Sequence, residues 1–350
     1  MNLEETLKQL ISFKTISHDH EEIARAYAWI KDQIQPVPVF VREMTHDNGH
    51  TSLFITTKEN DFEPKVWLAA HIDVVPGSEQ MFTPWIEDGK LYGRGSFDMK
   101  FAIAMYIELL KELGMDAQEY DFGIMFTSDE EVLGESMEIL FKKEGFRSEV
   151  VLLPDGGGTW EFEEAAKEAW VCKLTAHGRA AHGSSLWNGQ SAIRSLHACL
   201  SDFYALFDEV WEENDAHWHP TMNVGKITGG NVVNQVADHA EALLDMRFPT
   251  PQDRMHFEQK IAELMKQHPT VTFESEGILR GYSIDRNNSG IELFADIARE
   301  KYGIECGWQK AHGTSDARFI TEQDIPCVLI WPKAAGAHSE HEYIDVADMH

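Results

Sequence analysis

The strongest constraint on the fold is a set of short, uninterrupted apolar runs that end abruptly in polar or ionisable residues. The runs are VWLAA before His71, FGIMF before TSDEE, VVLL before Pro154 and CVLIW before Pro332. Such runs are typical of strands buried on both faces of a parallel sheet. Helical patterns alternate with them, and the clearest covers residues 99–113, with Asp98 as the predicted N-cap and Gly114 just after its end. This alternation predicts an α/β fold with a doubly wound, mostly parallel sheet, whose ligands bind beyond the carboxyl ends of the strands.

A different pattern begins near Trp170, where apolar and polar residues alternate as in a half-buried antiparallel strand. An amphipathic helix follows from Ile193 through Trp211. Two strands, a helix opened by Thr250-Pro251 and a last strand then complete a β-α-β-β-α-β order, which is that of the ferredoxin-like split unit. We therefore expect residues 165–280 to be a domain inserted into a first domain made of residues 1–164 and 281–350.

Charge and composition restrict the partners of this chain. Its 350 residues suit two domains, and 30 Lys plus Arg against 59 Asp plus Glu give a net charge of −29, which disfavours nucleic acid and anionic membranes. The four cysteines are far apart, which argues against a disulfide framework and a thiolate zinc site. The N-terminal segment MNLEETLKQL lacks the features of a signal peptide, and no apolar stretch approaches the ~18 residues of a membrane span. A cytoplasmic location is the expectation.

Ionisable residues collect at the predicted strand ends. Each has an ordinary interpretation when taken alone: a helix cap for Asp98, a core histidine for His71, a solvated helix start for the Asp129-Glu130-Glu131 run, a turn for Asp155 and a surface residue for His338. Their coincidence at one sheet edge favours a metal site. Imidazoles and carboxylates without thiolates suit two divalent cations, zinc first, with manganese or cobalt as alternatives.

The ordered set of motifs HIDVVPG, LYGRGSFDMK, TSDEE, LLPDGG, GRAAHGS, GGNVVNQV, LDMRF, GTSDARF and HSEHEYI resembles one family over nearly the whole chain. This family comprises the dinuclear-zinc exopeptidases and deacylases, with glutamate carboxypeptidase, carnosinase-like dipeptidases, acetylornithine deacetylase and succinyl-diaminopimelate desuccinylase. The resemblance implies that Asp98 bridges two metals, one held by His71 and Asp155 and the other by Glu131 and His338. It further implies that Asp73 orients His71 and that Glu130 is the general base acting on a metal-activated bridging water.

The same resemblance makes the inserted domain a lid and a dimerisation domain. His182 would reach the site of the other subunit of a homodimer as an oxyanion donor, Asn234 and Arg247 would approach the substrate, and Gly313 and Thr314 would line its pocket. The last four residues also have ordinary interpretations: Asn234 as a turn residue, Arg247 as a surface residue on a strand, and Gly313 and Thr314 as part of a tight turn.

We predict a metal-dependent hydrolase that cleaves a peptide or amide bond of a small substrate, of the dipeptidase or carboxypeptidase type. Asp at position 155 resembles the peptidase members, whereas Glu resembles the deacylases. One alternative is an N-acyl-amino-acid deacylase of the acetylornithine or succinyl-diaminopimelate type. Another is a catalytically silent binding relative, suggested by Phe101 and His312 at usual glycine positions and by a short C-terminal end. A two-metal phosphatase is disfavoured because no basic phosphate clamp is evident.

Overall fold

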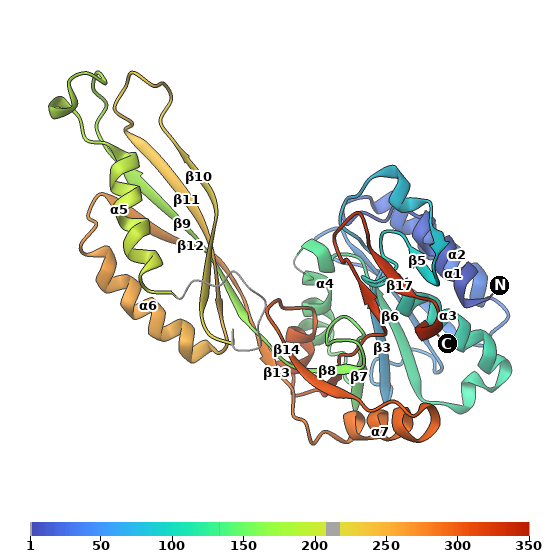
Figure 1. Ribbon diagram of the computed structural model, residues 1–350. Coiled ribbons are helices and arrows are strands. Elements are labelled where there is room, and N and C mark those ends of the chain that lie inside the picture. The colour runs from blue at the N-terminus through green and yellow to red at the C-terminus, as the bar shows by residue number, and fades with distance from the viewer. Residues whose placement is uncertain (1, 133, 208–217, 350) are drawn as a thin grey trace. The chain divides into compact units, whose positions relative to one another are not determined.

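The computed structural model describes residues 2–132, 134–207 and 218–349, and it divides into two compact units (Figure 1). Unit 1 contains Met1–Ala165, Ser283–Ala311 and Ser315–His350, and unit 2 contains Ala166–Tyr282 and His312–Thr314. The sequence-based division had counted residues 312–314 with the first domain.

Unit 1 is built on a six-stranded sheet in the order β1-β2-β6-β3-β7-β15. The predicted apolar runs form its parallel part, made of β3 (Val66–His71), β6 (Phe122–Thr127), β7 (Val150–Leu152) and β15 (Cys327–Val328). β1 (Phe40–Thr45) and β2 (Thr51–Thr56) form an antiparallel hairpin, and β2 is also antiparallel to β6. The fold is therefore a mixed α/β fold with a partly parallel sheet.

Helices cover this sheet. α1 (Leu3–Ser12) and α2 (His20–Ile34) both contact α3 (Lys100–Leu113), which packs on β3. α4 (Glu135–Glu138), α7 (Ser289–Ile297) and α8 (Ala317–Thr321) are shorter. The predicted N-cap of α3 is wrong: the cap position is Met99, with no side-chain cap bond, because the Asp98 carboxylate faces His71 and His338 instead.

Two small sheets complete unit 1. One has the order β16-β17-β5-β4, from Ala334–Ala335, Tyr343–Asp345, Lys90–Tyr92 and Trp85–Glu87. The other joins β13 (Tyr282–Ser283), β8 (Glu161–Ala166) and β14 (Gly307–Ala311). Antiparallel pairing of β17 with β5 brings the C-terminal motif beside the segment that leads into α3.

Unit 2 is a four-stranded antiparallel sheet in the order β10-β11-β9-β12 with two helices packed against it (Figure 1). Along the chain its elements are β9 (Glu168–His177), α5 (Ala192–Tyr204), β10 (Thr221–Gly229), β11 (His239–Phe248), α6 (Pro251–Met265) and β12 (Val271–Leu279). Alternate residues of β9, among them Trp170, Cys172 and Leu174, are buried in the core with Leu196 and Phe203 of α5. Trp211, predicted to continue that helix, lies outside the described residues.

None of the helices in the described ranges is both long and apolar enough to cross a membrane.

Candidate metal centre

The strand order of unit 1 determines where its ionisable residues meet. β6, β3 and β7 are neighbouring parallel strands, so their carboxyl ends lie at one edge of the sheet. His71 is the last residue of β3, the Asp129-Glu130-Glu131 run follows β6, and Asp155 comes shortly after β7. The polar residues that follow the buried apolar strands therefore lie together at this edge.

Asp98 lies at the centre of this cluster. Its Oδ1 is 3.0 Å from His71 Nε2 and its Oδ2 is 3.1 Å from His338 Nε2. His71 Nε2 is also 3.8 Å from Asp155 Oδ1, and His338 Nε2 is 3.0 Å from Glu131 Oε2. These contacts form two groups with metal-ligand chemistry, His71-Asp98-Asp155 and Asp98-Glu131-His338, and within each the ligand atoms lie within 4.8 Å of one another. The structure therefore brings all five predicted ligands together, with Asp98 common to both groups.

The donor atoms of this cluster fit divalent cations. Glu131 Oε1 and Asp155 Oδ2 are buried and have no hydrogen-bond partner among the described residues. Such burial is costly for carboxylates unless a cation accepts their lone pairs. Imidazole nitrogens and carboxylate oxygens without thiolates are the donor set of catalytic rather than structural zinc sites.

Contacts among the predicted ligands shift their pKa values. Burial lowers the pKa of His71, but hydrogen bonds to carboxylates, first that of Asp155, outweigh it and raise the pKa well above its usual value. The bond to Asp98 is the main reason why the pKa of His338 rises to about 10. Burial raises the pKa of Asp155 to about 6. For Asp98, burial opposes ionisation, but hydrogen bonds from His338 and His71 hold its pKa below the usual range. The imidazoles are thus positioned where a bound cation replaces their protons.

Asp73 organises two ligand segments. Its backbone carbonyl is 2.9 Å from His71 Nδ1, so Nδ1 donates and Nε2 faces Asp98. Its carboxylate accepts the N–H groups of Glu130 and Glu131, both at 3.2 Å, and the hydroxyl of Ser17 at 2.7 Å. Asp73 therefore holds the segment after β6 as well as the His71 ring, whereas the sequence had suggested only the second role.

Glu130 belongs to neither ligand group. Burial raises the pKa of its carboxyl group well above the ordinary value, and the charge of Asp155 raises it further. A carboxyl group with a raised pKa beside a metal centre is suited to accept and return a proton near neutral pH.

Asp316 is a buried residue of this unit that the sequence analysis missed. It is 1% exposed, and its Oδ1 occupies the place that a side chain at Gly134 would fill. Among the described residues neither of its carboxylate oxygens has a hydrogen-bond partner, and Arg318 Nη2 lies 4.0 Å from Oδ1. Gly134 has φ 68° and follows the Glu130-Glu131 segment, so glycine is required there on both counts. The motif GTSDARF, which also contains Gly313 and Thr314, is the sequence signal for Asp316.

His182 and Asn234 lie side by side in unit 2. Gly183 donates its N–H to the Asn234 carbonyl at 2.7 Å, and His182 forms a bridge with Gln235. His182 is exposed, and its Nδ1 accepts the Ser184 N–H at 3.2 Å, which leaves Nε2 as the ring's donor.

The other predicted pocket residues also belong to unit 2. Arg247 directs its guanidinium to Asp245, with Nε at 2.7 Å and Nη2 at 2.9 Å from the two carboxylate oxygens. Thr314 donates its hydroxyl to the Arg280 carbonyl at 2.9 Å, next to exposed Gly313. Phe101, at a usual glycine position, is instead a buried residue of unit 1 that lines a small apolar cavity.

Comparison with known proteins gives consistent matches over most of the chain. The family model described as peptidase family M20/M25/M40 matches residues 67–350. A succinyl-diaminopimelate desuccinylase from Delftia acidovorans is 27% identical over 305 residues, covering 82% of this chain and 78% of that protein. The desuccinylase from Methylobacillus flagellatus is 23% identical and covers 99% of this chain and 94% of that protein.

Solved structures share the fold. A tripeptidase from Staphylococcus aureus superposes with a TM-score of 0.81 at 20% identity, covering 99% of this chain and 94% of that chain. Human carnosine dipeptidase 1 has a TM-score of 0.73 at 14% identity, covering 99% and 92%. The M20 family metallo-carboxypeptidase Sso-CP2 from Sulfolobus solfataricus has a TM-score of 0.75 at 17% identity, covering 100% and 96%.

Proposed function

This chain belongs to peptidase family M20/M25/M40 and is a metal-dependent hydrolase of C–N amide bonds, and from that premise we propose that it is an exopeptidase of the dipeptidase or carboxypeptidase type. The observation that carries the proposal is the Asp98 carboxylate, each oxygen of which faces a histidine of a different ligand group. In the proposed centre Asp98 would be a ligand common to two divalent ions, zinc first and manganese or cobalt as alternatives. The residues that would hold these ions are His71, Asp98, Glu131, Asp155 and His338.

Individual residues of the chain have different roles in the proposed hydrolysis. When bound, the two ions polarise the scissile carbonyl and lower the pKa of the attacking water. Glu130 takes a proton from that water and returns it to the leaving amine, a task suited to its raised pKa. Asp73 keeps the His71 ring and the backbone of residues 130–131 in place. His182 donates from Nε2 to the developing oxyanion.

In this proposal residues 1–164 and 281–350 form the catalytic domain and residues 165–280 form a ferredoxin-like lid and dimerisation domain. The β-α-β-β-α-β order of the second domain and its sheet order β10-β11-β9-β12 support that assignment. Asn234, Gly313 and Thr314 would contact the substrate, and Arg247 would bind a substrate carboxylate after exchanging its contact with Asp245.

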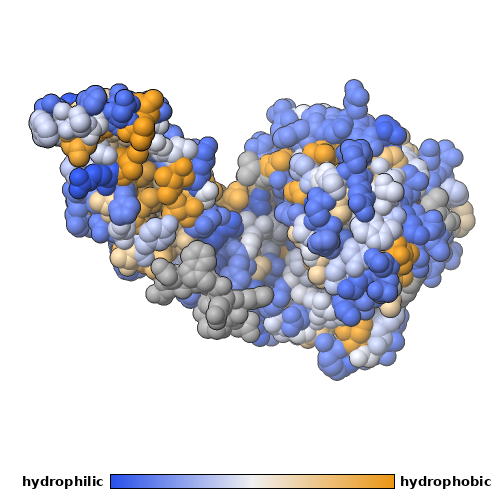
Figure 2. All heavy atoms as spheres, turned by 45° about the horizontal axis from the view of Figure 1, so that its top comes forward, coloured by the Kyte–Doolittle hydropathy of each residue, from blue (hydrophilic) through white to orange (hydrophobic). Residues whose placement is uncertain are grey.

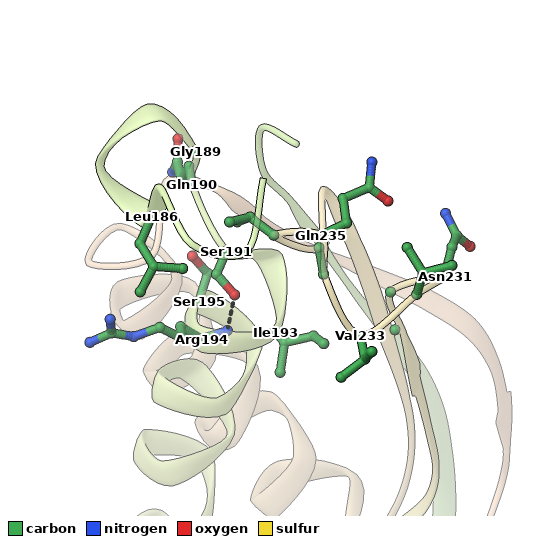
Figure 3. A pocket seen from close by; sticks show the side chains of 16 residues that line it. Leu186, Gly189, Gln190, Ser191, Ile193, Arg194, Ser195, Asn231, Val233 and Gln235 are labelled. Atoms are coloured by element: carbon green, nitrogen blue, oxygen red, sulfur yellow. Dashed lines mark hydrogen bonds between the residues drawn. The ribbon is translucent and has the colours of Figure 1, made fainter. Parts of the chain in front are cut away.

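The surface of unit 2 supports a homodimer. β10 is an edge strand of its sheet, and Ile227 on it is 59% exposed. Beside it, a groove of about 790 Å³ is lined by Leu186, Ile193 and Val233, which Figure 3 shows around its opening. Figure 2 shows hydrophobic residues gathered on the exposed surface of this unit. Pairing of two β10 edges would cover these side chains, and the proposal assigns His182 to the site of the other subunit.

The substrate type depends on one position and on the relatives. Asp155 favours a peptide, as in the peptidase members that the sequence resembles. The desuccinylases among the curated relatives favour the second candidate, an N-acyl-amino-acid deacylase. The juxtaposition of all five ligands opposes a catalytically silent binding protein. The cysteines Cys172, Cys199, Cys306 and Cys327 are free, which supports a reducing compartment such as the cytoplasm.

The test uses protein reconstituted with zinc or manganese and a panel of dipeptides, N-acetyl amino acids and N-succinyl amino acids. We expect dipeptide turnover, and Glu130→Gln should lower kcat by about 10²–10⁴-fold while both ions remain bound. Glu138→Gln, on the surface of α4, is the matched control and should retain activity. Turnover of acyl amino acids alone would assign the deacylase, and turnover of neither class would favour the silent relative.

A further inference from the structure

Glu342 is a fully buried carboxylate beside the metal centre that belongs to neither ligand group. Its Oε1 accepts three backbone N–H groups of one segment: Gly95 at 2.9 Å, Phe97 at 3.1 Å and Asp98 at 3.1 Å. One oxygen thus holds the backbone of the residue that both ligand groups share. Three N–H donors converging on a single carboxylate oxygen form a charge-assisted and geometrically restrictive contact.

The second oxygen of Glu342 binds Arg94, which is 2% exposed. Arg94 Nη2 also donates to the carbonyl of Pro76 at 3.4 Å. Pro76 lies in the segment that follows His71 and Asp73 along the chain. A buried ion pair therefore connects the Asp98 segment to the loop after β3.

Glu342 comes four residues after His338, so the two share one C-terminal loop. His338 Nε2 lies 3.1 Å from Asp98 Oδ2, and Glu342 accepts the N–H of the same Asp98. The base of the loop is fixed independently, because β17 pairs with β5 and Gly93 donates its N–H to the Glu342 carbonyl at 3.2 Å. One loop therefore contacts Asp98 twice: Glu342 binds its backbone N–H and His338 contacts its carboxylate.

The segment that Glu342 binds has little regular structure of its own. It connects β5 to α3 and contains Gly93 and Gly95 with φ of 151° and 84°. The N–H groups of Gly95, Phe97 and Asp98 point to the Glu342 side chain instead of a strand or helix partner. Without that acceptor, buried donors would be left unpaired unless the segment moved, and the bridging carboxylate would move with it.

We propose that Glu342 is a positioning residue of the metal centre. It fixes the position of Asp98 relative to His338, and this position determines the affinity with which the Asp98 carboxylate binds two ions at once. The inference rests on the proposed two-ion centre and is independent of which amide substrate is cleaved.

The test compares Glu342→Gln, which removes the charge, and Glu342→Asp, which keeps the charge but shortens the reach, with Glu340→Gln. Glu340 is a matched control because its carboxylate is in the same loop but binds Ser78. Stepwise zinc affinities are measured by chelator competition, and the coupling of two bound ions by electron paramagnetic resonance of the cobalt-loaded proteins. Both Glu342 variants should bind at least one of the two ions about 10–100-fold more weakly and lose coupling, while Glu340→Gln stays within about twofold of the parent.

The outcomes distinguish a failure of the two-ion centre from a failure of the role proposed for Glu342. If the parent protein binds fewer than two ions, the centre itself is wrong. If it binds two and the Glu342 variants match its affinities and coupling, with only the Tm of the metal-free protein lowered, Glu342 is merely structural and the inference is overturned. Should neither Glu342 variant fold, Arg94→Lys carries the test: weaker zinc binding supports the connected arrangement, and unchanged affinity contradicts it.

Discussion

At the scale of single residues, Asp98 differs from the other predicted ligands because both groups use it. Asp98→Ala should therefore weaken zinc binding at both sites, whereas Asp155→Ala should weaken only the site with His71. Zinc bound per chain after dialysis, measured by atomic absorption, distinguishes these patterns. Retention of one ion at parental affinity in Asp98→Ala would show that this carboxylate does not bridge.

A second residue, His46, couples protonation to folding. Its side chain is buried with Nε2 2.7 Å from Ser52 Oγ, and burial lowers its pKa below the ordinary value of about 6.5. The folded state then resists the proton that the unfolded chain accepts, so stability is full above pH ~6.5 and falls as the pH drops towards the lowered pKa.

His46→Gln should make this loss smaller than in the parent chain. Urea unfolding at pH 7.5, 6.5 and 5.5, with a chelator present to remove the metal contribution, measures the difference. An equal loss of unfolding free energy in both proteins over this range would contradict the assignment.

At the scale of elements, α6 shows a helix start specified by its own sequence. Thr250 is its N-cap and accepts the Asp253 N–H at 3.1 Å, with Pro251 in the first turn. Thr250→Ala should lower the free energy of unfolding of unit 2 by about 1 kcal/mol, and Thr250→Ser should retain most of the stability. Urea unfolding followed by circular dichroism tests this, and equal midpoints for Thr250→Ala and the parent would refute it.

At the scale of the whole molecule, the proposed dimer makes each site depend on two chains. Glu130→Gln and His182→Ala should each be inactive alone, but mixing them under conditions of subunit exchange should restore about a quarter of the parental activity. Half of the dimers would then be mixed, each with one site that has an intact Glu130 and the partner's intact His182. Absence of rescue, despite exchange verified with tagged chains, would place His182 in the site of its own subunit.

Disruption of the β10 edge supplies a companion measurement. Ile227→Glu adds a charge to an exposed position of this edge strand in a chain whose net charge is already −29. We expect a dimer for the parent and a monomer for the variant in sedimentation velocity, with hydrolysis reduced in proportion to dimer loss. A parent that sediments as a monomer while fully active would remove the dimer from the proposal.

The sequence by itself determined the features that depend on local patterns. Uninterrupted apolar runs specified β3, β6 and β7, and because parallel strands end at one edge, the residues that follow them were predicted to meet. The cap of α6 was predicted correctly because its hydrogen bond spans three residues. The hairpin of β1 and β2 was missed, although Asn48-Gly49 is the local turn signal that could have predicted it.

Tertiary structure decided the contacts that join distant segments. Asp98 looked like a helix cap, but its carboxylate meets His338, 240 residues away in the sequence. The Glu342 bond to the Asp98 backbone spans 244 residues, and the position of the buried Asp316 carboxylate beside Gly134 is likewise invisible to periodicity. Such contacts depend on how β17 pairs with β5 and how the sheet packs. Short-range patterns select elements and deliver candidate ligands to an edge, but only the packed fold fixes which polar atoms face one another.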